Sequence, residues 1–152
     1  MRLRIIAVGK LPPPTRALAK QYLDRLRREV DISVVEVREA PSGMGAPEAR
    51  RREAICLRDQ VGAGNLVIAL DQAGQLWTSP QIAGQFARWR SSGRDISVLV
   101  GGSHGLDATL LEEADARWSL GPITLPHQLA RLVLIEQLYR ATTILRKLPY
   151  HK

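Results

Sequence analysis

Short apolar runs alternate with segments of helical periodicity along the whole chain, and this alternation limits the fold more than any other feature. The expected strands cover residues 3–8, 32–37, 66–70 and 96–100, with a further strand-like segment at 118–120. The first expected helix starts at 12–15, the second covers 48–61, the third runs from Ser79 to about Trp89, and the last is a long helix at 128–145. Such alternation favours an α/β domain in which a mostly parallel sheet carries helices on both faces.

Two glycine-bearing loops follow strand ends in the second half of the chain. Gly101, Gly102 and Gly105 follow the fourth expected strand, and the loop at 119–127 leads into the long last helix. A turn is also expected at 71–74, after the third strand. Because ligands of parallel sheets bind beyond the carboxyl ends of the strands, these loops predict a small-molecule pocket. The alternative is that the glycine pair only makes a tight turn between a strand and a helix.

The common nucleotide-binding motifs do not occur in the sequence. The first strand ends in Gly9-Lys10-Leu11-Pro12 instead of a GxGxxG turn, and there is no P-loop string. No set of Cys and His residues has metal-ligand spacing, so no metal is expected. The loop at 119–127 is more informative, because its backbone groups could bond the edge of an adenine while apolar side chains cover the ring.

Size and charge bound the remaining possibilities. A chain of 152 residues most often forms one domain, and no apolar run reaches membrane-spanning length. The single cysteine, Cys56, excludes an internal disulfide and fits a reducing cytoplasm. The net charge of +7 indicates either a polyanionic partner or simply a basic soluble surface. The segment from His127 onward holds five Lys or Arg and one Glu, which is equally compatible with nucleic-acid binding and with a solvated helix face.

Several motifs, taken in order, resemble one known family along the full length of the chain. The most specific are Gly101-Gly102-x-x-Gly105, Trp118-Ser119-Leu120 and Thr124-Leu125-Pro126-His127. Weaker matches are Ala69-Leu70-Asp71 and the ending Pro149-Tyr150-His151. The ordered set resembles the small SPOUT methyltransferases, and more narrowly the bacterial ribosomal large subunit methyltransferase H family.

The resemblance implies a single domain over residues 1–152, with a deep trefoil knot at about 98–145 through which the last helix is threaded. It implies an S-adenosylmethionine-dependent enzyme that methylates N3 of a pseudouridine in 23S rRNA of the assembled ribosome, without a membrane or DNA partner. It also implies a homodimer in which the partner's tail completes each active site. The residues that match the family's cofactor pocket are Leu70, Gly101, Leu120, Gly121, Pro122, Ile123, Thr124 and Leu125.

Four polar residues are candidates for catalysis, namely His127, Arg131, Tyr150 and His151. N3 of the base must lose a proton near the time of attack, which a positive environment and a nearby base would both assist. Arg131 lies one helical turn beyond His127, so both side chains are expected to point the same way. His127 either orients the substrate or is a helix-start residue satisfied by backbone. Tyr150 either stacks on a base or anchors the tail.

The last expected helix, 128–145, is apolar on more than one face. One face can pack on its own sheet, and the remainder favours contact with a second subunit. The alternative is a helix buried centrally within one subunit. Arg140 lies one turn after Glu136 and is expected to pair with that carboxylate rather than to bind RNA.

Two other functions remain compatible with the sequence. A non-catalytic protein associated with the ribosome or with RNA would keep the fold and the positive charge. An α/β protein for a different nucleotide or a flavin would have no affinity for S-adenosylmethionine. Binding of that cofactor, together with methyl transfer to rRNA, separates both from the enzyme.

Overall fold

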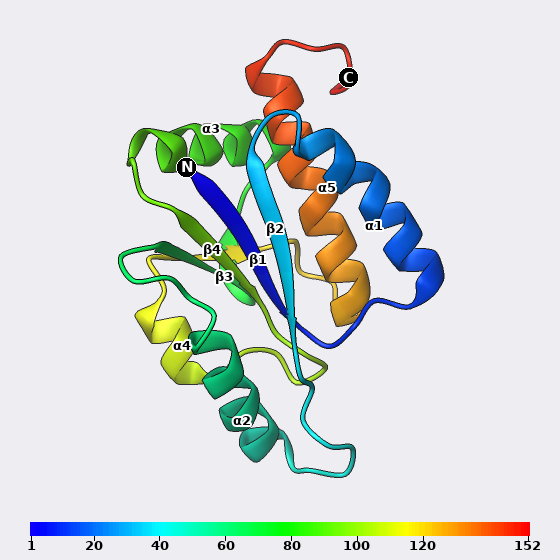
Figure 1. Ribbon diagram of the computed structural model, residues 1–152, viewed down its shortest axis with the longest axis vertical. Coiled ribbons are helices and arrows are strands. Elements are labelled where there is room, and N and C mark those ends of the chain that lie inside the picture. The colour runs from blue at the N-terminus through cyan, green and yellow to red at the C-terminus, as the bar shows by residue number, and fades with distance from the viewer.

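Five parallel strands form one central sheet in the computed structural model, which describes residues 1–152 (Figure 1). The strands are β1 (Arg2–Val8), β2 (Asp31–Val37), β3 (Leu66–Leu76), β4 (Ile96–Val100) and β5 (Ala116–Ser119). Their order is β2-β1-β4-β3-β5, and each neighbouring pair is parallel. The expected α/β class is therefore confirmed, and all the carboxyl ends lie at the same edge of the sheet.

Helices cover both faces of the sheet, as the alternating pattern predicts. They are α1 (Pro13–Leu26), α2 (Ala46–Arg58), α3 (Ser79–Ser91), α4 (Ala108–Glu113) and α5 (His127–Leu145). One face carries α1, α3 and α5, and the other carries α2 and α4 (Figure 1). Helix ends differ from the sequence expectation by a few residues, which is the usual uncertainty of such boundaries. None of these helices is long and apolar enough to cross a membrane.

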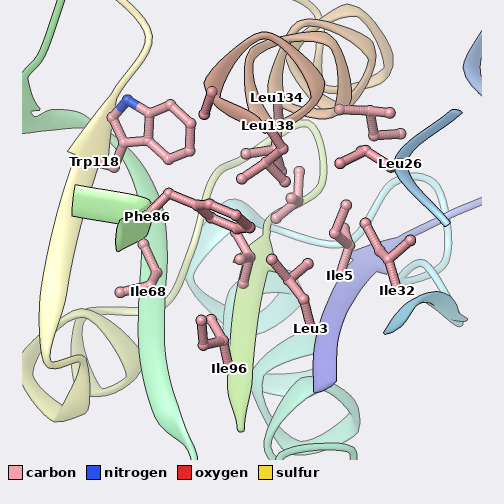
Figure 2. Close-up of a cluster of buried hydrophobic side chains, with 14 of the residues drawn as sticks. Leu3, Ile5, Leu26, Ile32, Ile68, Phe86, Ile96, Trp118, Leu134 and Leu138 are labelled. Atoms are coloured by element: carbon pink, nitrogen blue, oxygen red, sulfur yellow. The ribbon is translucent and has the colours of Figure 1, made fainter. Parts of the chain in front are cut away.

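The larger hydrophobic core lies between the sheet and the layer of α1, α3 and α5. Figure 2 shows Leu134 and Leu138 of α5 pointing toward the strands that carry Ile5 and Ile96. Burial of each such side chain contributes about 1.5–3 kcal/mol. Because α5 packs on the sheet and contacts α1 on one side and α3 on the other, its buried face fits the alternative of a helix placed centrally within one subunit.

The strand expected at 66–70 and the turn expected at 71–74 are one longer strand, β3, so the prediction of a turn is wrong. Trp118 of β5 pairs with β3 on both sides of the four supposed turn residues, which form an irregularity in the ladder. Gly74 approaches β5 so closely that a Cβ there would lie 2.8 Å from a backbone carbonyl carbon. Turn-forming residues also form strand bulges, and only the pairing with β5 distinguishes the two.

Asp107 begins α4, the short helix that follows the glycine loop. Its carboxylate accepts hydrogen bonds from the backbone N–H and the hydroxyl of Thr109, at 3.0 and 2.7 Å. These bonds to Thr109 hold the pKa of Asp107 below its ordinary value. The folded pKa is therefore lower than the unfolded one, so this stabilisation is present above the unfolded pKa and is lost as pH falls through the folded value.

We expect Asp107→Ala to lower the free energy of unfolding by about 1 kcal/mol at neutral pH, because α4 loses its N-terminal cap. Urea titrations of both proteins at several pH values measure the difference. The difference should shrink as the pH falls through the folded pKa of Asp107. A difference that stays constant with pH would show that the carboxylate charge is not responsible.

Candidate active site

A cavity of about 860 Å³ lies at the carboxyl end of β4 and beside the middle of β3. Its walls come from Leu70–Gln72 of β3, the glycine loop after β4, the loop after β5 and the first turn of α5. All of the residues assigned to the cofactor pocket except Pro122 line it: Leu70, Gly101, Leu120, Gly121, Ile123, Thr124 and Leu125. Pro122 lies outside the lining, and its carbonyl accepts a hydrogen bond from the Gln72 side chain at 3.4 Å.

The glycine loop folds back on itself at the floor of this cavity. A Cβ at Gly101 would lie 2.5 Å from the carbonyl carbon of Gly105, closer than packed atoms approach. The N–H of Gly105, at a φ of +76°, donates to the carbonyl of Gly102 at 3.1 Å. The glycines are therefore required by the close approach of two backbone segments as well as by the turn itself.

The loop after β5 presents free backbone donors to the cavity. The N–H groups of Ile123, Thr124 and Leu125 donate to no other group of the protein. The Gln72 side chain reaches the Thr124 hydroxyl at 3.4 Å and so ties this loop to β3. A row of unpaired donors beside apolar side chains suits the edge and faces of a heterocyclic ring.

His127 is the first residue of α5 and lines the cavity. A Cβ at Gly9 would lie 3.8 Å from His127 Nε2 and 3.4 Å from Glu39 Oε2, so the imidazole also stands beside the end of β1. The ring makes no hydrogen bond to backbone, so the alternative in which backbone groups satisfy a histidine at the helix start is not seen. The imidazole is thus available to a ligand.

Arg131 does not present its side chain to the same site as His127. Its guanidinium is 1% exposed and donates to Glu36 Oε1 at 2.7 Å. It also donates to the carbonyls of Val8 and Gly9, at 3.3 and 2.8 Å. Burial lowers the pKa of Arg131, and the bond to Glu36 opposes that effect. Both side chains lie beside Gly9, but Arg131 is buried and does not line the cavity, whereas His127 does.

The tail packs against the far end of α5. The Tyr150 ring lies edge-on to Tyr139 with centroids 4.9 Å apart, and its hydroxyl donates to Glu136 at 3.0 Å. Burial, helped by Tyr22 and Glu136, raises the pKa of Tyr150 above its ordinary value. Arg140 bonds Glu136 at 2.7 Å, as the helical spacing predicts.

The four catalytic candidates are not gathered within one chain. His127 begins α5, whereas Tyr150 and His151 follow its other end, with His151 Nδ1 3.4 Å from Arg140. A helix of 19 residues is about 28 Å long, and Figure 1 shows the C-terminus at the end of α5 remote from its start. The tail of a chain therefore does not reach that chain's own cavity in this structure.

Several lining residues were not assigned to the pocket from the sequence. They include Arg50, Asp71, Gly102 and His104. Arg50 belongs to the arginine run in α2 and donates to the His104 carbonyl at 3.4 Å. Asp71 directly follows an assigned residue, so its position was a usable signal. Nothing in the sequence indicates that α2 reaches the glycine loop, because the two segments are far apart in the chain and meet only in the folded protein.

Comparison with known proteins gives the same family that the sequence motifs resemble. The chain matches the family described as "Predicted SPOUT methyltransferase" over residues 1–151. It is 47% identical to the ribosomal RNA large subunit methyltransferase H of Anaeromyxobacter sp. (strain Fw109-5), with 100% of both chains covered. The chain belongs to the methyltransferase H family. The methyltransferase H of Hahella chejuensis (strain KCTC 2396) is 39% identical, with 100% of this chain and 99% of that protein covered.

Solved structures of related fold are more distant from this chain in sequence. A probable methyltransferase from Bordetella pertussis Tohama I aligns with a TM-score of 0.56 at 17% identity, covering 92% of this chain and 93% of that one. AviRb from Streptomyces viridochromogenes, solved with AdoMet, gives 0.50 at 14% identity, covering 93% of this chain and 58% of AviRb. These likenesses show the fold. Family membership, and not these likenesses, identifies this chain as a methyltransferase, for which S-adenosylmethionine is the cofactor.

Proposed function

We propose that this protein methylates N3 of a pseudouridine in 23S rRNA, on the assembled ribosome in the cytoplasm. The observation that carries the proposal is the cavity at the carboxyl end of β4, lined by seven of the eight residues assigned to the cofactor pocket, in a chain 47% identical to a named rRNA methyltransferase. The net charge of +7 suits a polyanionic substrate.

The cavity fits S-adenosylmethionine by size and by chemistry. Its volume of about 860 Å³ suits a small-molecule cofactor. The free N–H groups of Ile123, Thr124 and Leu125 would hold the adenine edge, and Leu120 would cover the ring. When bound, the cofactor supplies a methyl group activated by a positively charged sulfur, which leaves alignment as the main task of the protein.

Residues in and near the cavity would have separate roles in methyl transfer. His127 lines the cavity with an imidazole that makes no hydrogen bond within the protein, and it would take the N3 proton. Arg50, at the same cavity, would lower the pKa of N3 through its positive charge. Arg131 is a positioning residue, since it ties the start of α5 to the end of β1. Tyr150, with its raised pKa, stays a neutral phenol that donates a hydrogen bond or stacks on a base.

We further propose a homodimer in which the tail of one chain completes the cavity of the other. The separation of His127 from Tyr150 and His151 along α5 supports this arrangement. We also propose that residues 98–145 form the family's trefoil knot. In support, the chain passes from β4 through β5 at the sheet edge and then returns as α5 between α1 and α3.

The proposed substrate is tested by mass spectrometry of large-subunit rRNA from a deletion strain. We expect one methylated pseudouridine to lose its methyl group and to regain it with the wild-type gene. Purified protein should transfer the methyl group to ribosomes lacking it. Binding of S-adenosylmethionine without any transfer to rRNA would instead favour the non-catalytic alternative.

The proposed dimer predicts complementation between two inactive variants. His127→Ala damages the cavity and Tyr150→Ala damages the tail, so each homodimer should be inactive. After subunit exchange, mixed dimers hold one intact site, and activity should return to about a quarter of wild type. Methyl transfer to ribosomes before and after exchange is the measurement. No recovery after verified exchange would place both residues in the same site of one chain.

A further inference from the structure

A buried carboxylate that none of the preceding steps uses lies behind the glycine loop. Glu53 of α2 is only 4% exposed. Its Oε1 accepts the backbone N–H of Ala40 at 3.0 Å, whereas its Oε2 has no hydrogen-bond partner although it is buried. It forms no ion pair with any Lys, Arg or His. A buried carboxylate left uncompensated in this way is costly and calls for a physical reason.

The carboxylate is separated from the cavity only by the backbone of Gly102. A Cβ at Gly102 would lie 3.0 Å from Glu53 Oε2 and 3.2 Å from Oε1, so the carboxylate fills the space that a side chain would take. Gly102 itself lines the cavity. A negative charge on Glu53 therefore acts on a ligand across one backbone segment, and its burial keeps screening weak.

We infer that Glu53 makes the cavity prefer the positively charged cofactor over its uncharged product. Methyl transfer converts the sulfonium of S-adenosylmethionine into the neutral thioether of S-adenosylhomocysteine, and one positive charge leaves with the methyl group. A fixed buried carboxylate stabilises the sulfonium form and not the thioether form. Glu53 is thus a specificity-determining residue that favours cofactor loading and product release. This inference rests on the assigned cofactor and is independent of the RNA substrate.

Other charged groups at the cavity do not supply the same discrimination. Arg50 is positive and opposes binding of a cation. Asp71 lines the cavity and is negative, but it is only half-buried, so solvent screens its charge. Glu53 combines a negative charge, exclusion from solvent and a free oxygen beside the glycine loop.

Calorimetric affinities of both ligands for purified variants test the inference. Glu53→Gln keeps an acceptor for Ala40 but removes the charge. We expect this change to weaken the binding of S-adenosylmethionine on the order of tenfold and the binding of S-adenosylhomocysteine by less than about twofold. Glu48→Gln, an exposed change on the same helix, should alter neither affinity. Asp71→Asn should alter the ratio of the two affinities less than Glu53→Gln does.

Three results would overturn the inference. Equal weakening of both ligands by Glu53→Gln would show that the residue only shapes the loop, and an unchanged ratio would show that its charge does not reach the ligand. A wild-type protein that binds the thioether more tightly than the sulfonium would contradict it even if Glu53→Gln failed to fold. If the wild type binds neither ligand, the assignment of the cofactor is rejected. If the wild type prefers the sulfonium but does not methylate rRNA, only the proposed RNA substrate is rejected.

Discussion

Replacement of Arg131 by alanine is expected to lower the free energy of unfolding by about 2–3 kcal/mol, because the hydrogen bonds of a buried cation are lost. The guanidinium is 1% exposed and bonds Glu36 as well as the carbonyls of Val8 and Gly9. The Glu36 side chain is 27% exposed and can turn to water, so the cost falls mainly on the two carbonyls that lose a donor. Since a domain of this size is only marginally stable, the variant should unfold at a much lower urea concentration.

Arg58→Ala is the matched control for this measurement. Arg58 pairs with Glu113 on the surface, with side-chain exposures of 43% and 56%, and such pairs contribute at most about 1 kcal/mol. Arg131→Lys separates charge from geometry, because lysine keeps the charge but cannot bond three acceptors in a planar fork. We expect the free energy of unfolding of Arg131→Lys to lie between those of the wild type and Arg131→Ala. If Arg131→Ala costs no more than Arg58→Ala, the network around the end of β1 is not a structural requirement.

Gly101→Ala should raise the dissociation constant for S-adenosylmethionine by about 100-fold or more, because a displaced loop misaligns every group it carries. The added Cβ would meet the Gly105 carbonyl carbon at 2.5 Å and its oxygen at 2.7 Å. Both contacts are to backbone, so rotation of a side chain cannot relieve them. The loop must open, and the cavity floor moves with it. Gly101→Val should act in the same way and more strongly.

Gly84→Ala is the control for the added methyl group. A Cβ at Gly84, which lies on α3, meets nothing within 4 Å, so cofactor affinity should be unchanged. Thr124→Pro tests the second loop, since it removes one free N–H from the cavity. Both loop variants should keep the circular dichroism spectrum of the wild type. Undiminished affinity in Gly101→Ala and Thr124→Pro would mean that the cofactor binds elsewhere.

The elements and the pocket were largely predictable because each depends on local sequence. Apolar runs such as 96–100 form strands wherever both faces are covered, and all five of these residues are buried. The glycine loop and the loop at 119–127 follow strand ends, and parallel strands bring such ends together. Of the residues assigned to the pocket, only Pro122 is absent from the cavity lining, although it belongs to the same loop.

The pair of Arg140 and Glu136 within one helix was predictable, but side-chain partners that are distant in sequence were not. Helical spacing placed Arg131 beside His127 but could not indicate that the carbonyls of Val8 and Gly9 would draw it inward. Glu53 gave no signal, since its significance lies in its contact with Gly102 across the fold.

The sequence alone determined the order of strands and helices, the parallel sheet and the loops that line the cavity, since periodicity and glycine placement act over a few residues. The tertiary structure alone decided that β3 continues through 71–74, that Arg131 is buried, and that Glu53 lies against Gly102. Those outcomes follow from contacts between segments far apart in the chain, and local patterns carry no information about which distant groups will meet.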